Sequence, residues 1–190
     1  MGMVDFDNDG FLDLFVAGGH VQTNEELYSS RSSRQSNRVF RNLGDRTFRD
    51  VTPECGADFQ QVGLHRGAAF GDLDGDGRVD AVVTRLNEPV EILLNRTEPA
   101  GHYLLVRLVG TRASRDGLGA SLRLTLPSGR TFVRHATSAV GYGGSSDRRV
   151  HFGLGGEGRI ERLEITWPGG RVQVLENLKA DQVLEVREHE

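Results

Sequence analysis

Two short acidic segments carry the residues best suited to binding chemistry. "DFDNDGFLD" begins at Asp5 and "DLDGDGRVD" begins at Asp72, and both follow the pattern D-x-D-x-D-G-x-x-D. Glycine at position six permits a sharp bend that turns alternate side chains toward one centre. Because the candidate ligands are all hard oxygens, the pattern predicts two Ca²⁺ sites, with Mg²⁺ and Mn²⁺ less favoured. The predicted ligands are the carboxylates of Asp5, Asp7, Asp9 and Asp13 with the carbonyl of Phe11, and the carboxylates of Asp72, Asp74, Asp76 and Asp80 with the carbonyl of Arg78.

Neither segment is an EF-hand loop. An EF-hand places a bidentate glutamate at position twelve and a helix on each side, whereas position twelve here is Val16 or Val83, inside an apolar run typical of a strand. A single Asp/Gly-rich segment is equally typical of a solvated turn. Two copies with every motif position filled, each leading into the same kind of strand, favour metal binding over that alternative.

An internal repeat predicts the strands that position these loops. Asp5 and Asp72 are 67 residues apart, whereas "VFRN" and "ILLN" end at Asn42 and Asn95, only 53 residues apart. The first copy therefore holds a 14-residue insertion within "GGHVQTNEELYSSRSSRQSNR", which we expect to form a surface loop. In that copy "NLGD" joins "RVFRN" to "TFRDVT" as a hairpin. Short strands and Gly-rich turns in a repeat of this length predict two propeller blades, at about residues 1–52 and 60–98.

The remaining residues, 99–190, predict a second all-β unit. "HYLLVRLVG" and "ASLRLTLPSGRTFVRHA" alternate apolar and polar residues with a period of two. "LEITWPGGRVQVL" reads as a hairpin that turns at Pro168-Gly169-Gly170, and no segment shows a convincing helical period. "NRTEPAG" is the expected linker between the two units. The predicted fold class is thus all-β, with a partial β-propeller followed by a β-sandwich-like domain.

Composition narrows the class of protein. The net charge of −4 gives no electrostatic case for nucleic acid binding, and no apolar run approaches the roughly 20 residues needed for membrane insertion. Eight of the 27 acidic residues lie in the two loops, so two divalent cations would neutralise the formal charge. The single cysteine, Cys55, excludes an internal disulfide and a cysteine-based zinc site, and we expect it to be a small buried residue.

The loops resemble the calcium loops of FG-GAP/VCBS propeller repeats, and the second unit resembles an ASPIC/UnbV domain. "RDGLGASLRL", "VRHATSAVGYGGSSDRRVHFGLG" and "ITWPGGRVQVLENL" carry the second match, and "GGH…NRVFRNLGDRTFRDVT" matches the stretch that links the final repeats. The combination is similar to the cartilage acidic protein-like family. One departure is Gly143-Gly144-Ser145-Ser146, where that family more often has bulkier residues. If this segment is a partner surface, the departure implies an altered or more flexible one.

The resemblance implies a non-enzymatic protein that is secreted, extracellular or periplasmic. It also implies about five further blades upstream, with this chain as a C-terminal piece. The expected function is a calcium-stabilised scaffold that recognises an extracellular protein or glycan. A metal-dependent hydrolase and a lectin-like carbohydrate-binding module remain the alternatives. Exposed blade faces are expected to allow self-association.

Single residues add weaker signals. His135 and His151 lie beside Arg134 and Arg149 and could hold an anion, although structural or surface histidines are more frequent. Trp167 could stack on a sugar, but a core or rim position at a hairpin end is the commoner role. Asn95-Arg96-Thr97 is a glycosylation sequon.

The two loops differ in the strand that enters them. Only Met1 to Val4 precede the first loop, whereas "HRGAAFGD" enters the second. We therefore expect the first calcium site to be weaker and the second to be the more secure.

Overall fold

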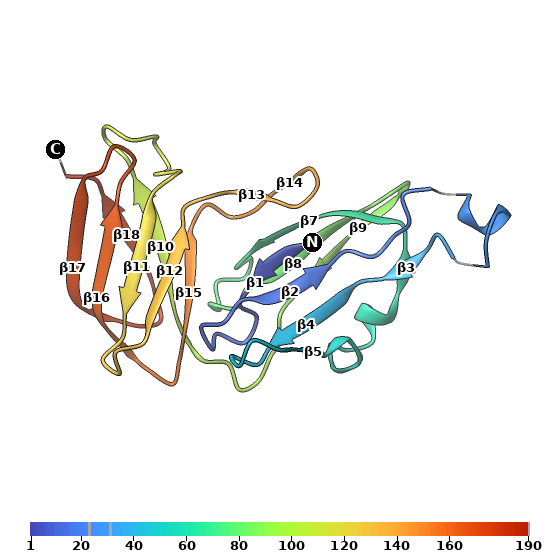
Figure 1. Cartoon of the computed structure of the whole chain (residues 1–190), viewed down its shortest axis with the longest axis horizontal. Helices are drawn as coiled ribbons and strands as arrows, with labels where there is room; N and C mark the ends of the chain where they lie inside the picture. The colour runs from blue at the N-terminus through green and yellow to red at the C-terminus, as the bar shows by residue number, and fades with distance from the viewer. Residues whose placement is uncertain (23, 31, 190) are drawn as a thin grey trace.

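The computed structural model describes residues 1–22, 24–30 and 32–189. The described chain consists of β-strands with three short 3-10 helices, and its sheets form two groups that lie side by side (Figure 1). The predicted all-β class is therefore confirmed. Among the described residues, no helix has the length and apolar character needed to cross a membrane.

The first blade is a four-stranded antiparallel sheet in the order β1-β2-β4-β5. Its strands are β1 (Gly2–Val4), β2 (Asp13–Val16), β4 (Arg38–Asn42) and β5 (Phe48–Asp50). The first acidic loop connects β1 to β2, and residues 43–47 turn β4 back into β5 as the "NLGD" signal predicts. The segment that carries the insertion lies between β2 and β4, and its described part includes η1 (Glu25–Leu27) and β3 (Gln35–Ser36).

The second blade repeats this plan with three strands. They are β7 (His65–Gly71), β8 (Asp80–Arg85) and β9 (Glu88–Leu93), and the second acidic loop connects β7 to β8. Between the blades the chain forms η2 (Thr52–Glu54), η3 (Asp58–Gln60) and β6 (Val62–Gly63), which pairs with β3. Both acidic loops therefore occupy the same position, after the first strand of a blade.

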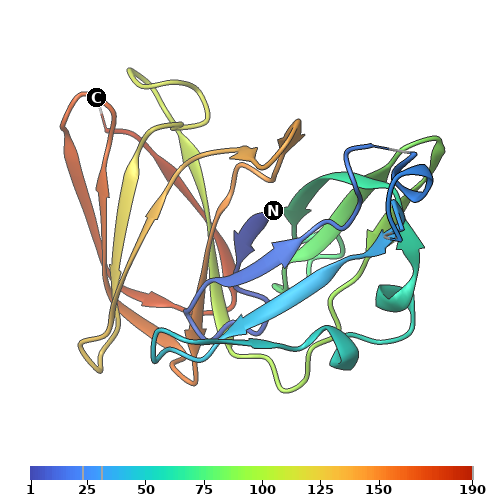
Figure 2. The same cartoon turned by 45° about the vertical axis from the view of Figure 1, so that its right-hand side comes forward.

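The blades pack face to face through an apolar core. Phe15 and Val39 of the first blade and Phe70 and Val83 of the second are buried in one cluster. The rings of Phe15 and Phe70 meet edge to face with centroids 5.3 Å apart, an arrangement that adds to the hydrophobic contribution. This packing sets the two acidic loops next to each other at one end of the blades (Figure 2).

The second group of sheets is a β-sandwich. One sheet has the order β15-β10-β18 and the other β12-β11-β16-β17. Their strands are β10 (His102–Val109), β11 (Ser121–Thr125), β12 (Thr131–His135), β15 (Val150–Gly155), β16 (Arg159–Thr166), β17 (Val172–Lys179) and β18 (Gln182–Arg187). The alternating apolar residues of β10, β11 and β16 face a single core, as their period of two predicts. The hairpin at residues 168–170 joins β16 to β17, also as predicted.

Trp167 belongs to this core. Its side chain is almost completely buried, and its indole N–H donates to the Gln173 side-chain oxygen over 3.1 Å. A buried indole with its only donor satisfied cannot offer a flat face to a sugar. The structural role for Trp167 is therefore the correct one.

A hairpin from the second unit reaches back onto the second blade. It consists of β13 (Ala139–Val140) and β14 (Gly144–Ser145), and in Figure 1 it lies beside β7. The Phe70 N–H donates to the Ser146 hydroxyl over 3.0 Å, and the Asp147 N–H donates to the Phe70 carbonyl over 2.9 Å. The Gly143–Ser146 segment is thus engaged by the chain's own blade, where its small residues permit a close approach to β7.

The expectation for Cys55 was wrong. The residue follows η2 and is exposed rather than buried. Its thiol lies 3.3 Å from the Val51 carbonyl, and partial desolvation together with nearby Glu54 and Asp50 raises its pKa to about 11. Cys55 directly follows the short η2 turn, lines the space between the blades and belongs to neither core.

Candidate metal centres

The first aspartate of each loop organises the backbone around its own carboxylate. Asp5 accepts hydrogen bonds from the N–H groups of Asp9 (3.1 Å) and Gly10 (2.9 Å). Asp72 accepts the equivalent bonds from Asp76 (3.1 Å) and Gly77 (3.1 Å). Because these bonds need the loop to double back over five residues, the glycine at position six, with φ of 96° and 83°, supplies the required left-handed conformation.

The ninth-position aspartate ties each loop to two strands. Asp13 accepts from the N–H of Asn42 over 2.8 Å, and Asp80 accepts from the N–H of Asn95 over 2.7 Å. The same two carboxylates also accept from the second residue of their loops, Phe6 and Leu73. The repeat aligned Asn42 with Asn95, but the sequence assigned neither a role in the acidic loops. Their hydrogen bonds to the loop aspartates depend on strand pairing, which cannot be predicted from a local motif.

Three carboxylates converge in each loop. Ligand oxygens of Asp5, Asp7 and Asp13 lie within 4.8 Å of one another, and so do those of Asp72, Asp74 and Asp80. The other two predicted carboxylates lie outside these groups and fold onto the loop backbone. Asp9 accepts from the N–H of Phe11, and Asp76 accepts from the N–H of Arg78. The carbonyl ligands predicted at Phe11 and Arg78 stay predictions.

Arginines compensate the negative charge of both loops. Arg41 lies 2.5 Å from the Asp7 carboxylate and 3.8 Å from that of Asp9. Arg96 lies 2.8 Å from the Asp74 carboxylate and 3.1 Å from that of Asp76. The two arginines flank the paired asparagines, Arg41 directly before Asn42 and Arg96 directly after Asn95, so each blade brings one guanidinium to its own loop.

Burial shifts the pKa values of the carboxyl groups more strongly in the first loop than in the second. Desolvation, reinforced by neighbouring aspartates, raises the pKa of Asp5 to about 7, and desolvation raises the pKa of Asp13 to about 6. In the second loop, the hydrogen bond and charge of Arg96 hold the pKa of Asp74 below its usual value. The first loop therefore gathers carboxylates in surroundings that disfavour their charged form.

Asp7 provides the clearest sign that a cation fits. Both of its carboxylate oxygens are buried without a hydrogen-bond partner, although one lies close to the Arg41 guanidinium. Burial followed by the charge of Asp9 raises its pKa. Buried oxygens without donors are costly unless something positive satisfies them. An all-oxygen donor set around that position suits Ca²⁺.

The first loop is also clamped by the sandwich. Its backbone carbonyls at Asp7 and Asn8 accept hydrogen bonds from the N–H groups of Gly101 (2.9 Å) and Gly155 (2.7 Å). Two arginines from β12 and its preceding turn complete the contact: Arg130 donates to the Asp9 carbonyl over 2.8 Å, and Arg134 donates to the Gly10 carbonyl over 3.0 Å. Four consecutive carbonyls of one loop thus bind the other unit.

The second loop makes a smaller contact with the same unit. Arg149 donates to the Asp72 carbonyl over 3.0 Å, and the His151 imidazole lies 3.3 Å from the Gly77 carbonyl. Enclosure lowers the pKa of His151 to about 4, so this imidazole is neutral at physiological pH. The Asn8 side chain bridges the two loops by donating to Gly77. His151 is therefore structural, and His135 is exposed on β12.

Comparisons with known proteins match both units. The FG-GAP-like repeat family matches residues 5–83, and the ASPIC and UnbV family matches residues 110–190. The chain is therefore similar to FG-GAP-like repeats over its first part and to an ASPIC/UnbV domain over its last part. It is 27% identical to human cartilage acidic protein 1 over 188 residues, which cover 97% of this chain and 27% of the relative.

Two further relatives carry the same name. Mouse cartilage acidic protein 1 is 27% identical over 172 residues, covering 88% of this chain and 25% of the relative. The Xenopus tropicalis protein is 28% identical over 174 residues, with the same two coverages. This chain spans about a quarter of the length of these relatives.

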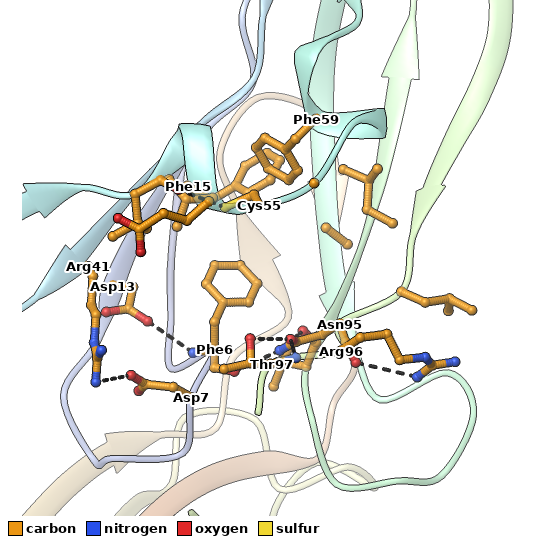
Figure 3. Close-up of a pocket in the computed structure, with 18 of the residues that line it drawn as sticks. Phe6, Asp7, Asp13, Phe15, Arg41, Cys55, Phe59, Asn95, Arg96 and Thr97 are labelled. Carbon is orange, nitrogen blue, oxygen red and sulfur yellow. Dashed lines mark hydrogen bonds and ion pairs between the residues drawn. The ribbon is translucent and has the colours of Figure 1, made fainter. Parts of the chain in front are cut away.

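A cleft of about 800 Å³ is lined by residues of both FG-GAP blades (Figure 3). Asp7, Asp13 and Arg41 lie at one end of it, and Phe59 and Cys55 lie at the other. No histidine lines the cleft among the residues that the structure describes, and the arginines on its walls pair with carboxylates. The first metal centre therefore borders a partly apolar cleft.

Asn95 has a structural use within the FG-GAP blades. Its side-chain amide donates to the carbonyls of Phe6 (2.7 Å) and Val79 (3.2 Å), and its amide oxygen accepts from Thr97. A glycan on this nitrogen would displace the bond that joins the two loops through Phe6. The side chain of the sequon asparagine is therefore already engaged in hydrogen bonds within the blades.

Calcium affinity at the first loop should depend on pH. The pKa of Asp5 is about 7 and that of Asp13 is about 6. At pH values below 7, calcium must therefore displace protons from these two carboxyl groups. We expect the first site to weaken about tenfold between pH 7.5 and pH 6. Calorimetric calcium titrations of an Asp74→Ala variant, which keeps only the first site, measure this change. An Asp7→Ala variant reports the second site, and an equal pH dependence in both variants would contradict the prediction.

Proposed function

We propose that this chain is a non-catalytic, calcium-binding recognition module. The observation that carries the proposal is the convergence of three aspartates in each loop, with the Asp7 Oδ1 buried and without a partner while Oδ2 faces Arg41. Asp5, Asp7 and Asp13 hold one Ca²⁺, and Asp72, Asp74 and Asp80 hold the other. A bound ion supplies positive charge at the centre of each loop and relieves the repulsion among its carboxylates.

In this proposal calcium also rigidifies the contact between the two units. The carbonyls that bind Gly101, Gly155 and Arg134 come from the same loop whose carboxylates hold the ion. A loop that is fixed by its ion presents these carbonyls in one arrangement, whereas an ion-free loop must hold repelling carboxylates beside a desolvating surface. Calcium thus maintains one rigid surface made by the blades and the ASPIC/UnbV domain together.

The proposed recognition role rests on the proteins to which this chain is similar and on its calcium loops. The matching relatives are named for cartilage, and calcium at the concentrations found outside cells would keep even weak sites of this kind filled. We therefore place the protein in a secreted, extracellular or periplasmic compartment, where its rigid surface binds a protein or a glycan. Burial of Trp167 removes the aromatic platform that most favoured a lectin-like role.

Calcium binding is tested by isothermal titration calorimetry of the chelator-stripped chain. We expect two sites in the unaltered protein and one in each of the variants Asp7→Ala and Asp74→Ala. Asp58→Ala, which changes an exposed aspartate outside both loops, should keep two. The absence of any calcium-dependent heat in the unaltered chain would refute the proposal.

A metal-dependent hydrolase is the second candidate, because Asp7 and Asp13 border the cleft together with Arg41. An ion there with an open coordination position could activate a water molecule, and the arginine could bind an anionic substrate. Phosphate-ester and carboxylic-ester substrates, assayed with Ca²⁺, Mg²⁺ or Mn²⁺, distinguish the two functions. Hydrolysis that disappears in Arg41→Ala would favour the enzyme over the recognition module.

A further inference from the structure

The β13–β14 hairpin covers one edge of the second blade (Figure 1). β7 is the edge strand of its sheet, and the edge in question is the one opposite β8. There the Phe70 N–H donates to the Ser146 hydroxyl over 3.0 Å, and the Phe70 carbonyl accepts from the Asp147 N–H over 2.9 Å. A strand edge carries backbone groups that are ready to pair with another segment. The residues that follow β14 therefore occupy this edge as an added strand would.

Two glycines set how closely the hairpin approaches β7. A Cβ on Gly144 would lie 2.5 Å from the Ala68 carbonyl oxygen, and a Cβ on Gly67 would lie 2.9 Å from the Tyr142 carbonyl oxygen. Neither glycine has a positive φ, so the lack of space excludes larger residues at both positions. Val140 of the same hairpin packs against the apolar core between the blades. The hairpin and its seat on β7 thus fit each other closely.

The hairpin has little internal stability of its own. β13 and β14 pair through only two residues each, and three of residues 141–144 are glycine. Tyr142 at the tip is 81% exposed. A short two-stranded hairpin is at best marginally stable in water, and glycine loses more conformational entropy on ordering than other residues. The closed position therefore depends on the bonds to β7 and on what holds Ser146 and Asp147.

Asp147 connects the hairpin to the second acidic loop. Its carboxylate binds the Arg149 guanidinium, with Nε at 2.7 Å and Nη2 at 2.5 Å. The same guanidinium donates to the backbone carbonyl of Asp72, the first residue of that loop, over 3.0 Å. A Cβ on Gly71 would lie 2.9 Å from the Asp147 Cβ, so the two segments also touch directly. One arginine thus binds the hairpin and the loop at the same time.

We propose that the β13–β14 hairpin is a strap whose closure on β7 is coupled to calcium in the second loop, an inference that rests on the proposed function. With the ion bound, the loop backbone at Asp72 is fixed and the negative charge of the loop is reduced. Arg149 then bridges the Asp72 carbonyl and the Asp147 carboxylate, and Asp147 holds the strap on Phe70. Without the ion, the loop carboxylates compete with Asp147 for Arg149, and the strap opens more often.

Amide hydrogen exchange, measured residue by residue by NMR, tests the strap. The amides of Phe70 and Asp147 are bonded across the contact and report its opening. Gly144→Ala places a Cβ against the β7 backbone and should speed exchange at both amides by about tenfold or more, while β8 amides stay protected. Tyr142→Ala removes an exposed side chain from the same hairpin and should leave exchange unchanged. Unaltered exchange in Gly144→Ala would overturn the strap.

The same amides, compared in millimolar calcium and in excess EDTA, test the coupling. In the unaltered chain EDTA should speed exchange at Phe70 and Asp147 by about fivefold or more. Asp74→Ala, which removes a carboxylate of the second loop, should exchange fast under both conditions. Asp7→Ala alters the first loop and should keep the response to calcium. A response that is lost equally in both variants would overturn the assignment to the second loop.

Arg149→Ala tests the link itself, and Arg148→Ala is its matched control. Arg149→Ala should exchange fast with and without calcium while calorimetry still finds two calcium sites. Arg148 pairs instead with Asp116 over 2.6 Å, so its loss should leave the response intact. Two calcium sites in the unaltered chain with exchange that ignores calcium would overturn the coupling and leave the proposed function standing. A chain that binds no calcium would overturn both.

Discussion

Excess EDTA is expected to lower the unfolding temperature of this chain by about 10 °C or more relative to millimolar calcium. At free calcium of about 100 times the dissociation constant, each filled site adds about 2.7 kcal/mol to the free energy of unfolding. In a chain of this size 1 kcal/mol corresponds to roughly 2–4 °C. Thermal unfolding followed by circular dichroism or by calorimetry, with and without the chelator, measures the shift.

Two variants measure how much each calcium site contributes to this difference in unfolding temperature. Asp7→Ala and Asp74→Ala should each remove about half of the difference between calcium and EDTA, since each alters one of the converging carboxylate groups. Asp58→Ala should retain the full difference. Melting curves that coincide with and without calcium would show that the loops are held by their arginines and hydrogen bonds alone.

Replacing Gly153 by alanine is expected to separate the first loop from the ASPIC/UnbV domain. A Cβ at this position would lie 2.1 Å from an Asp5 carboxylate oxygen and 2.5 Å from backbone atoms of Asn8. Because Gly153 faces the loop from the middle of β15, neither side can yield without breaking the contact. We expect the loss of one calcium site and a destabilisation of about 1–3 kcal/mol from overpacking.

Gly156→Ala supplies the control for this substitution. Gly156 lies three residues further on, in the turn after β15, and a Cβ there meets no atom within 4 Å. It should therefore preserve two calcium sites and the unfolding temperature. If Gly153→Ala also binds two calcium ions with unchanged affinity, the ASPIC/UnbV domain does not shape the first metal centre. Limited proteolysis near residues 94–101 gives a second readout of the separation between the units.

Much of this protein follows from local sequence patterns. The D-x-D-x-D-G-x-x-D motif predicts a loop that folds around its first carboxylate, because glycine at position six permits the bend that Asp5 and Asp72 need. Alternation with a period of two predicts the strands, and turn residues such as Pro168-Gly169-Gly170 predict the hairpins. The offsets between repeats likewise predict two blades with equivalent positions. All of these signals act over a few residues or between copies of one pattern.

The tertiary structure alone decided which groups meet across long distances. Asn42 and Asn95 serve the loops through strand pairing, and the sandwich residues Gly155 and Arg134 bind the first loop from more than a hundred residues away. Burial by that domain, and not the motif, makes the pKa values of the carboxyl groups in the first loop depart more from their usual values than those in the second. The strand that enters the first loop, β1, has three residues, all paired with β2, whereas β7 has seven, and the weaker first site stays a prediction. Desolvation and charge pairing depend on the whole packed surface, and for that reason no single segment of the sequence could report them.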